Sequence, residues 1–203
     1  MFFLGHMCWA YIFGKATGQL TSRMPQIQLS IICSILPDVD LLLRIEHGGI
    51  MHSIAFWIIV YVPLLLCIGP RRGLPYLVST LQHLLFGDFI TSRYKILLPF
   101  NRGYGLGLGL LSPISLSLEV LGFSFFIVCT YFTQELMLLF SMKSRNLLSL
   151  LPAVAMLVSI IFVLRLSYIS PFFEAIQALF MLLLLGSFLM GMVEEIRYKY
   201  LHG

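Results

Sequence analysis

The sequence predicts an all-α fold, a polytopic membrane helical bundle of about six to seven helices. Hydrophobic residues make up 59% of the 203 residues, charged residues make up 11%, and the mean hydropathy is +0.95. A soluble domain contains about half apolar and about a quarter charged residues, so this chain has too little polar surface to face water on all sides. We therefore expect an integral, multi-pass membrane protein.

Apolar segments that are candidates for membrane-associated helices follow one another along the whole chain, since about 20 helical residues cross ~30 Å of hydrocarbon. In order they are Phe2–Leu20, Ile27–Leu43, Ile54–Ile68, Tyr76–Ile90, Leu116–Phe140, Leu147–Leu164 and Phe172–Val193. The first, second and fourth are short or interrupted by polar residues, and one re-entrant segment would lower the number to six. The first lacks the basic region of a secretory signal and is expected to be retained.

The chain is expected to divide near residue 105 into two halves of different character. Residues 1–105 hold all three aspartates and four of the five histidines, whereas residues 106–203 form a transmembrane helical half with a short charged C-terminal tail. In that second half Glu119 and Arg165 are candidates for a pair within the bundle, or for interfacial positions with the charge reaching water. The four cysteines are scattered, which favours neither a disulfide framework nor a thiolate zinc site.

The net charge of +4 is spread over short loops between the apolar segments. Such loops are expected beside anionic lipid headgroups, so membrane lipid is the predicted partner and a nucleic acid is not. A mild excess of basic residues favours an orientation with the N-terminus outside and the C-terminus inside. Whatever the orientation, alternation of the spans brings one set of side chains to the same membrane face: His6, Asp38, Asp40, His47, His52 and Asp88, with His83 somewhat deeper in that half.

The first motif of this set is Leu36-Pro37-Asp38-Val39-Asp40, at the end of an apolar run. Pro37 is expected to end or kink the helix at about Leu36. Two carboxylates two residues apart in a non-helical segment converge on one cation or divide the roles of ligand and base. The alternative is a polar turn at the membrane surface.

The second motif is His47-Gly48-Gly49-Ile50-Met51-His52-Ser53, directly before an apolar segment. Two histidines that flank a glycine turn can direct both imidazoles toward one centre. Neutral imidazole is a good ligand for zinc and other divalent transition metals. The alternative is a pair of interfacial histidines that face lipid headgroups.

The third motif carries His83 and Asp88 in an otherwise apolar helix, where ionisable groups are costly and seldom face lipid. A spacing of four residues would place both on one helix face. The actual spacing of five turns them about 140° apart on an ideal helix. A bulge or a helix end at Gly87 would correct this.

Taken in order, these motifs resemble one known family. His6, Leu-Pro-Asp-Val-Asp, His-Gly-Gly-Ile-Met-His-Ser, His-Leu-Leu-Phe-Gly-Asp-Phe-Ile-Thr and the Leu-Leu-Pro-Phe of Leu97–Phe100 are similar to the pattern of the YdjM-like family of membrane-bound, metal-dependent hydrolases. That pattern has an early histidine, LPDxD, HRGxTHS, HxxxDxxT and a Pro-Phe pair. The resemblance covers about Phe3–Phe100. Gly48 stands where the family has arginine, Met51 where it has threonine, and the gap from His83 to Asp88 is one residue longer.

The resemblance implies a membrane-embedded metal-dependent hydrolase of the cell (inner) membrane. Its expected ligands for one or more divalent ions, with zinc as the expected metal, are His6, Asp38, His52, His83 and Asp88. Asp40 and His47 are the expected catalytic residues, either completing the metal shell or acting as general base. A site at headgroup level favours a lipid or lipid-linked (phospho)ester as substrate, with Arg93, Lys95 and Arg102 placed to bind its phosphate.

Two other functions use the same residues. A metal- or proton-coupled transporter would use the ligands as a permeation site, but they cluster at one membrane face and the second half lacks a matching set at mid-depth. A structural membrane protein with a polar cap does not account for so many converging ionisable groups.

Overall fold

The computed structural model describes residues 1–40, 47–100, 102–164 and 170–202. Within these ranges the chain is helical and contains no strand, apart from an isolated antiparallel bridge between Tyr94 and Tyr104. The predicted all-α fold is thereby confirmed. The chain forms two compact units, Met1–Phe126 and Ile127–Gly203, so the boundary between them falls inside one helix. The functional division expected near residue 105 is a different one and stays a prediction.

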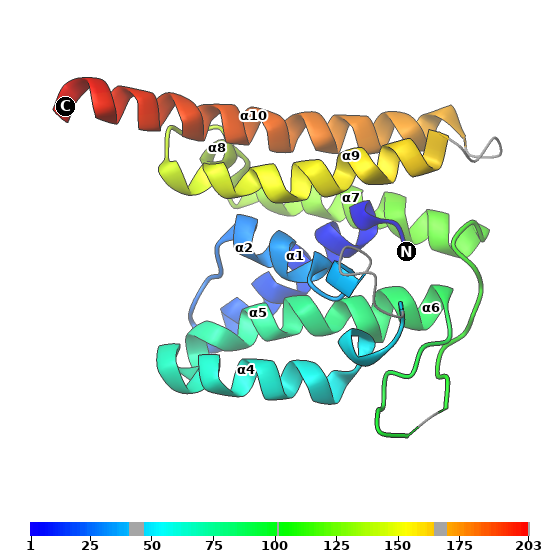
Figure 1. Ribbon diagram of the computed structural model, residues 1–203. Coiled ribbons are helices and arrows are strands. Elements are labelled where there is room, and N and C mark those ends of the chain that lie inside the picture. Colours follow the sequence, from blue (N-terminus) through cyan, green and yellow to red (C-terminus); the bar gives the residue numbers. More distant parts are fainter. Residues whose placement is uncertain (41–46, 101, 165–169, 203) are drawn as a thin grey trace. The chain divides into compact units, whose positions relative to one another are not determined.

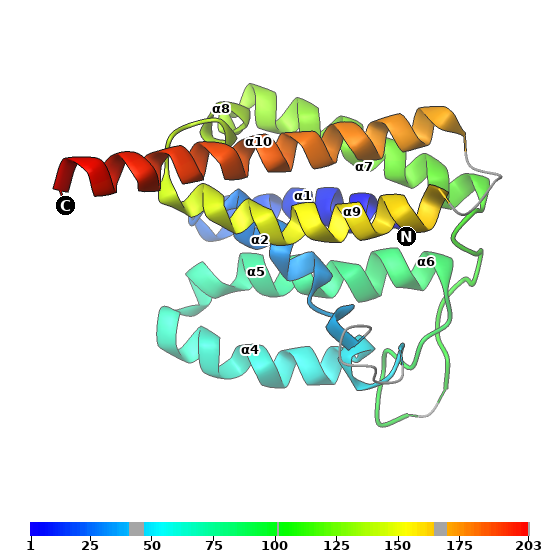
Figure 2. The ribbon, with the colours of Figure 1, turned by 45° about the horizontal axis from the view of Figure 1, so that its top comes forward.

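The first unit contains both short and long helical elements. They are α1 (Phe3–Thr21), α2 (Ile27–Ile35), the 3₁₀ turn η1 (Ile50–His52), α4 (Ile54–Ile68), α5 (Pro70–Gln82), the π-helix η2 (His83–Asp88), α6 (Phe89–Thr91) and the first part of α7 (Pro113–Phe132). Helix α1 packs against both α2 and α5, and α4 lies along α5 (Figures 1 and 2). Helix α5, η2 and α6 follow one another without a break from Pro70 to Thr91.

Helix α2 ends early, as its proline predicts. The helix stops at Ile35, and the backbone N–H of Asp38 donates to the carbonyl of Ile35 in the turn that follows. The expected segment Ile27–Leu43 is therefore interrupted after nine helical residues, and its last three residues, 41–43, lie outside the described ranges. This turn takes Asp38 out of α2, and helical backbone resumes at Val39 and Asp40.

The N-terminus of α1 is capped by a side chain from a distant helix. Phe2, at the N-cap position, makes no side-chain capping bond. Instead the buried carboxylate of Glu119 in α7 accepts hydrogen bonds from the backbone N–H groups of Phe2 and Gly5, each at 2.5 Å. A carboxylate at this end satisfies N–H groups that have no partner within the helix and complements the helix dipole. Glu119 is fully buried, so the expected interfacial position is wrong, and Arg165, the other expected partner, lies outside the described residues.

Replacing Glu119 with alanine is expected to destabilise the chain. Two buried N–H groups would lose their acceptor, at a cost of roughly 2–4 kcal/mol. Thermal unfolding of the detergent-solubilised protein, followed by circular dichroism, should show a lower midpoint. The matched control is Glu174→Ala in α10, which should leave the midpoint nearly unchanged, and equal midpoints for the two variants would contradict the capping role.

The second unit contains the rest of α7, α8 (Glu135–Leu139), the 3₁₀ helix η3 (Ser144–Ser149), α9 (Leu150–Leu164) and α10 (Pro171–His202). Helix α10 packs along η3 and α9. The side-chain amide of Asn146 donates to the carbonyls of Leu138, Leu139 and Ser141, which closes the turn between α8 and η3. The hydroxyl of Ser149 donates to that of Ser187 at 3.0 Å and joins η3 to α10.

Three helical segments of the described chain are long and apolar enough to cross a membrane: Pro113–Phe132, Ser144–Phe162 and Pro171–Leu201. Ile54–Ile68 is apolar but shorter. The expected segment Leu116–Phe140 is not one continuous helix. Helix α7 ends at Phe132, and Gln134 turns the chain with a positive φ of 58° before α8 begins.

Candidate metal centre

Side chains from four segments of the first unit converge at one place. All seven histidines and aspartates predicted for the site take part: His6 from α1, Asp38 and Asp40 from the turn after α2 and the helical residues that follow it, His47 and His52 from the segment around η1, and His83 and Asp88 from η2. Five of them are buried, Asp38 is half-buried and His47 is exposed. The cluster therefore has a buried interior and an open side at His47.

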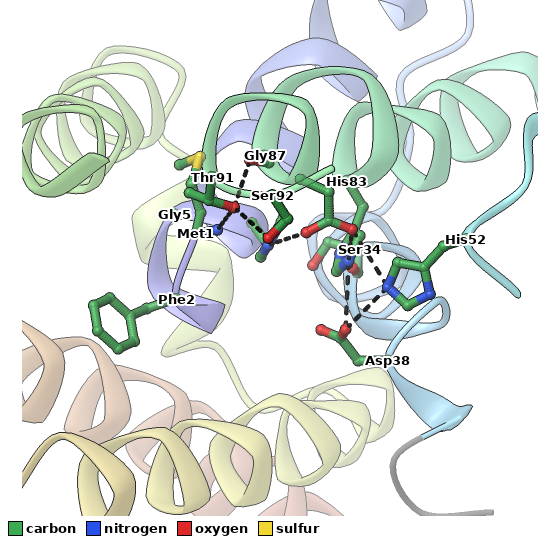
Figure 3. Close-up of polar contacts among 12 residues, drawn as sticks. Met1, Phe2, Gly5, Ser34, Asp38, His52, His83, Gly87, Thr91 and Ser92 are labelled. Carbon is green, nitrogen blue, oxygen red and sulfur yellow. Dashed lines mark hydrogen bonds and ion pairs between the residues drawn. The ribbon is translucent and has the colours of Figure 1, made fainter. Parts of the chain in front are cut away.

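Four donor atoms form the interior of the cluster. Nε2 of His52 lies 3.6 Å from Oδ1 of Asp38 and 3.3 Å from Oδ2 of Asp88. Nε2 of His83 lies 3.4 Å and 3.2 Å from the same two oxygens. Figure 3 shows Asp38 and His52 directed toward each other and toward His83. Ligand atoms at about 2.0–2.1 Å from a tetrahedral zinc ion are about 3.3 Å apart, so these separations match the edges of such a polyhedron.

Three of these donor atoms are buried without a hydrogen-bond partner among the described residues. They are Nε2 of His52, Nε2 of His83 and Oδ2 of Asp88. Buried polar atoms are nearly always partnered, because leaving them unpaired costs the full desolvation penalty. Lone pairs that meet in one buried place are satisfied together by a cation. The residues present therefore fit a divalent metal ion.

A second set of contacts orients the two donor imidazoles. Nδ1 of His83 lies 2.6 Å from the carbonyl oxygen of Ser34. Since a carbonyl only accepts, Nδ1 carries the proton and Nε2 keeps its lone pair for the centre. Nδ1 of His52 lies 3.1 Å from Oδ2 of Asp40, an ion-pair contact that lacks hydrogen-bond geometry. A carboxylate or carbonyl behind a ligating imidazole is the usual arrangement in metal sites.

Asp40 also contacts the exposed histidine. Its Oδ1 lies 3.0 Å from Nδ1 of His47, and its carboxylate is fully buried. One carboxylate thus hydrogen-bonds His47 at the open side and lies within ion-pair distance of His52 on the interior side. This places Asp40 behind the donor atoms and not among the four that form the interior.

The π-helix explains how His83 and Asp88 reach the same site although they are spaced five residues apart. In a π-turn the repeat closes over five residues, so His83 and Asp88 come to one face although they are five residues apart. The bulge expected at Gly87 is thereby confirmed. A Cβ on Gly87 would collide with the ring of His6, so the glycine also admits that imidazole.

His6 adjoins the four donors. Its ring stacks on that of His83 with centroids 3.8 Å apart and an interplanar angle of 14°. Its Nε2 lies 3.8 Å from Oδ1 of Asp88, and its Nδ1 is buried without a hydrogen-bond partner in the described chain. One ligand atom each of His6, His83 and Asp88 lies within 4.8 Å of the others. His6 is therefore placed to add a fifth ligand.

The predicted substrate-binding residues lie on the segment after α6. Arg93 and Arg102 are exposed and Lys95 is half-buried. The side chain of Arg93 runs beside Gly107, where an added Cβ would be 3.1 Å from its Nε. These three residues do not belong to the donor cluster, and their role in binding substrate stays a prediction.

Two residues of the site were missed in the sequence. Ser34 acts through its backbone carbonyl, so its side chain gives no signal. The ring of Tyr94 packs edge-on at 5.0 Å from His52 and 5.3 Å from His47. Burial raises the pKa of the Tyr94 phenol, and the nearby Asp88, Asp38 and Asp40 raise it further against the opposing effect of Ser92. Placed between Arg93 and Lys95 in the sequence, this tyrosine resembles an ordinary loop residue.

Comparison with known proteins leaves the family open. No protein-family profile matches the chain, and neither a curated protein nor a solved structure shows significant similarity to it. The resemblance of its motifs to the YdjM-like family therefore stays a prediction, and the function has to be argued from the site.

Proposed function

We propose that this protein is a membrane-embedded, metal-dependent hydrolase of the cell (inner) membrane, acting on a lipid or lipid-linked (phospho)ester. The observation that carries the proposal is the convergence of buried, unpartnered donor atoms from His52, His83 and Asp88 beside Asp38. The second support is the Asp40–His47 pair at the open side of the same cluster.

His52, His83, Asp38 and Asp88 would hold the ion, with His6 as the adjoining fifth donor. Two imidazoles and two carboxylates suit zinc, which takes nitrogen and oxygen ligands in fourfold or fivefold coordination. When bound, such an ion polarises the ester oxygen and acidifies water.

His47 is the proposed general base. Its Nδ1–H donates to Asp40, which leaves Nε2 free to accept a proton from the attacking water. The side chain is 34% exposed, so water and substrate can reach it. As the water oxygen bonds to the phosphorus or carbonyl carbon, the ester bond to the leaving oxygen breaks, and the proton held on Nε2 passes to that oxygen. Asp40 stabilises the positive imidazolium formed in between.

The lipid nature of the substrate is inferred from location. Three helical segments long and apolar enough to cross a membrane, together with the high overall hydropathy, favour a site reached from the headgroup layer. Arg93, Lys95 and Arg102 supply the positive charge that a phosphate needs there.

Metal analysis of the purified protein tests the site. We expect one or more divalent ions per wild-type chain, and a loss of at least about tenfold in bound metal for His52→Ala and for Asp88→Ala, because each removes a donor. Glu174→Gln, a change of charge outside the cluster, is the matched control and should retain the metal. Wild-type protein that contains no metal after chelator-free purification would overturn the proposal.

Hydrolysis in detergent separates the proposed enzyme from a transporter, the alternative function for the same ligands. Catalysis needs no sealed membrane, whereas transport does. Cleavage of phosphoester or lipid ester substrates by the solubilised protein, lost in His47→Ala, supports the hydrolase. Metal binding without any cleavage, combined with metal uptake into sealed vesicles, would instead support the transporter.

A further inference from the structure

An aromatic side chain borders the open side of the cluster. Tyr94 follows α6 and is held in an extended pairing with Tyr104, whose backbone N–H donates to the carbonyl of Tyr94 at 2.9 Å. Its ring meets His52 at an interplanar angle of 65° and His47 at 79°, both edge-on. The ring therefore touches one proposed metal ligand and the proposed base at the same time.

The glycine turn between His47 and His52 leaves the space that the Tyr94 ring occupies. Gly48 is buried and has a φ of +79°, a conformation that side chains rarely adopt. A Cβ at Gly48 would collide with the ring of Tyr94. The ring is thus bounded by His47, by His52 and by the glycine turn between them, and it occupies the space that a side chain at position 48 would need.

The segment that carries Tyr94 is tied to the cluster through its backbone. The backbone N–H of Ser92, two residues before Tyr94, donates to the carbonyl of Asp88 at 2.8 Å. A tyrosine that packs on two site histidines with a fixed ring brings a neutral O–H donor to the edge of the cluster. Arg93 and Lys95 flank it in the chain and add positive charge to the same segment. An anionic oxygen is the ligand that this combination suits.

We propose that Tyr94 is a substrate-positioning residue, which donates a hydrogen bond through its hydroxyl to a non-bridging oxygen of a phosphoester lying between the donor cluster and His47. The inference rests on the proposed hydrolase function and deepens it, because it assigns a phosphoester, and not a carboxylic ester, as the substrate class. Tyr94 stays protonated throughout and takes no part in proton transfer.

Tyr94→Phe tests the role without disturbing the packing, since it removes one oxygen and keeps the ring. Three quantities are measured on the detergent-solubilised, zinc-loaded protein: bound metal, the affinity for inorganic phosphate by calorimetry, and turnover of bis(p-nitrophenyl) phosphate. We expect the amount of bound metal to be unchanged, phosphate binding to be weaker by roughly tenfold or more, and kcat/KM to fall by a similar factor. A loss of this size corresponds to the free energy of one hydrogen bond to a charged group. Tyr104→Phe, its partner in the bridge, is the matched control and should equal the wild type.

Gly48→Ala provides an independent variant, because it displaces the ring from the opposite side. It should weaken phosphate binding as Tyr94→Phe does while the metal is retained. Wild-type phosphate affinity and turnover in Tyr94→Phe would overturn the inference and leave the hydrolase intact. Turnover of p-nitrophenyl acetate with no phosphate binding would overturn the assignment to phosphoesters. A wild-type chain without metal would instead refute the underlying function.

Discussion

Inserting one alanine after Leu85 is expected to abolish metal binding, whereas deleting Leu85 should preserve it. The insertion separates His83 and Asp88 by six residues, which places them on different faces of an α-helix and exceeds the five-residue repeat of the π-turn. The deletion brings the two residues to a spacing of four, which one face of a regular α-helix accommodates. Gly87 stays directly before Asp88 in both variants, so the room for His6 is kept.

Bound zinc per chain, measured after chelator-free purification, distinguishes the two variants. Leu85 is 48% exposed, so its removal empties no core position. Comparable thermal midpoints would show that both chains are folded. Metal lost equally from the insertion and the deletion would contradict the role assigned to the π-turn. Metal retained in both would show that His83 and Asp88 are not ligands of one ion.

Replacing Asp40 with asparagine is expected to lower turnover by roughly 10³-fold or more, because His47 loses the carboxylate that fixes its tautomer and stabilises its positive form. The same change should weaken metal affinity by about 10–100-fold, since Asp40 also lies behind His52. Both readouts respond because one carboxylate serves two imidazoles.

His47→Gln is the companion to that experiment. It removes the base but none of the four interior donors, so it should lose turnover and keep the metal. If Asp40→Asn retained full metal affinity, the contact between Asp40 and His52 would have no orienting role. If it retained full turnover, the Asp40–His47 pair would not be the base.

The helical fold and much of the cluster were predictable from the sequence for a simple physical reason. Successive helices that pack side by side alternate in direction, so polar groups at the ends of successive apolar segments come to one side. Helix α2 ends just before Pro37, as expected, and Asp38 lies in the turn that follows. Gly87 marked the bulge that reconciles His83 with Asp88. These signals are local, and each is carried by a residue whose backbone preference is strong.

What could not be predicted depends on distant or backbone contacts. Glu119 caps α1 from positions 117 and 114 residues away from Phe2 and Gly5 in the sequence. No residue near Phe2 indicates that this cap exists. The carbonyl of Ser34 orients His83 although any residue offers such a group. The helix break before α8 depends on the positive φ of Gln134. Composition alone predicts one continuous apolar helix across this position. Tertiary packing decides each of these.

The π-helix has a consequence for how such sites are recognised in other sequences. A π-turn is an α-helix that has gained one residue, and it returns the flanking turns to their former register. A centre of this kind therefore tolerates a histidine and an aspartate separated by three or by four intervening residues, with the donors in equivalent places. A search pattern with a fixed gap rejects the longer version, whereas a pattern with a variable gap and a glycine before the aspartate accepts both.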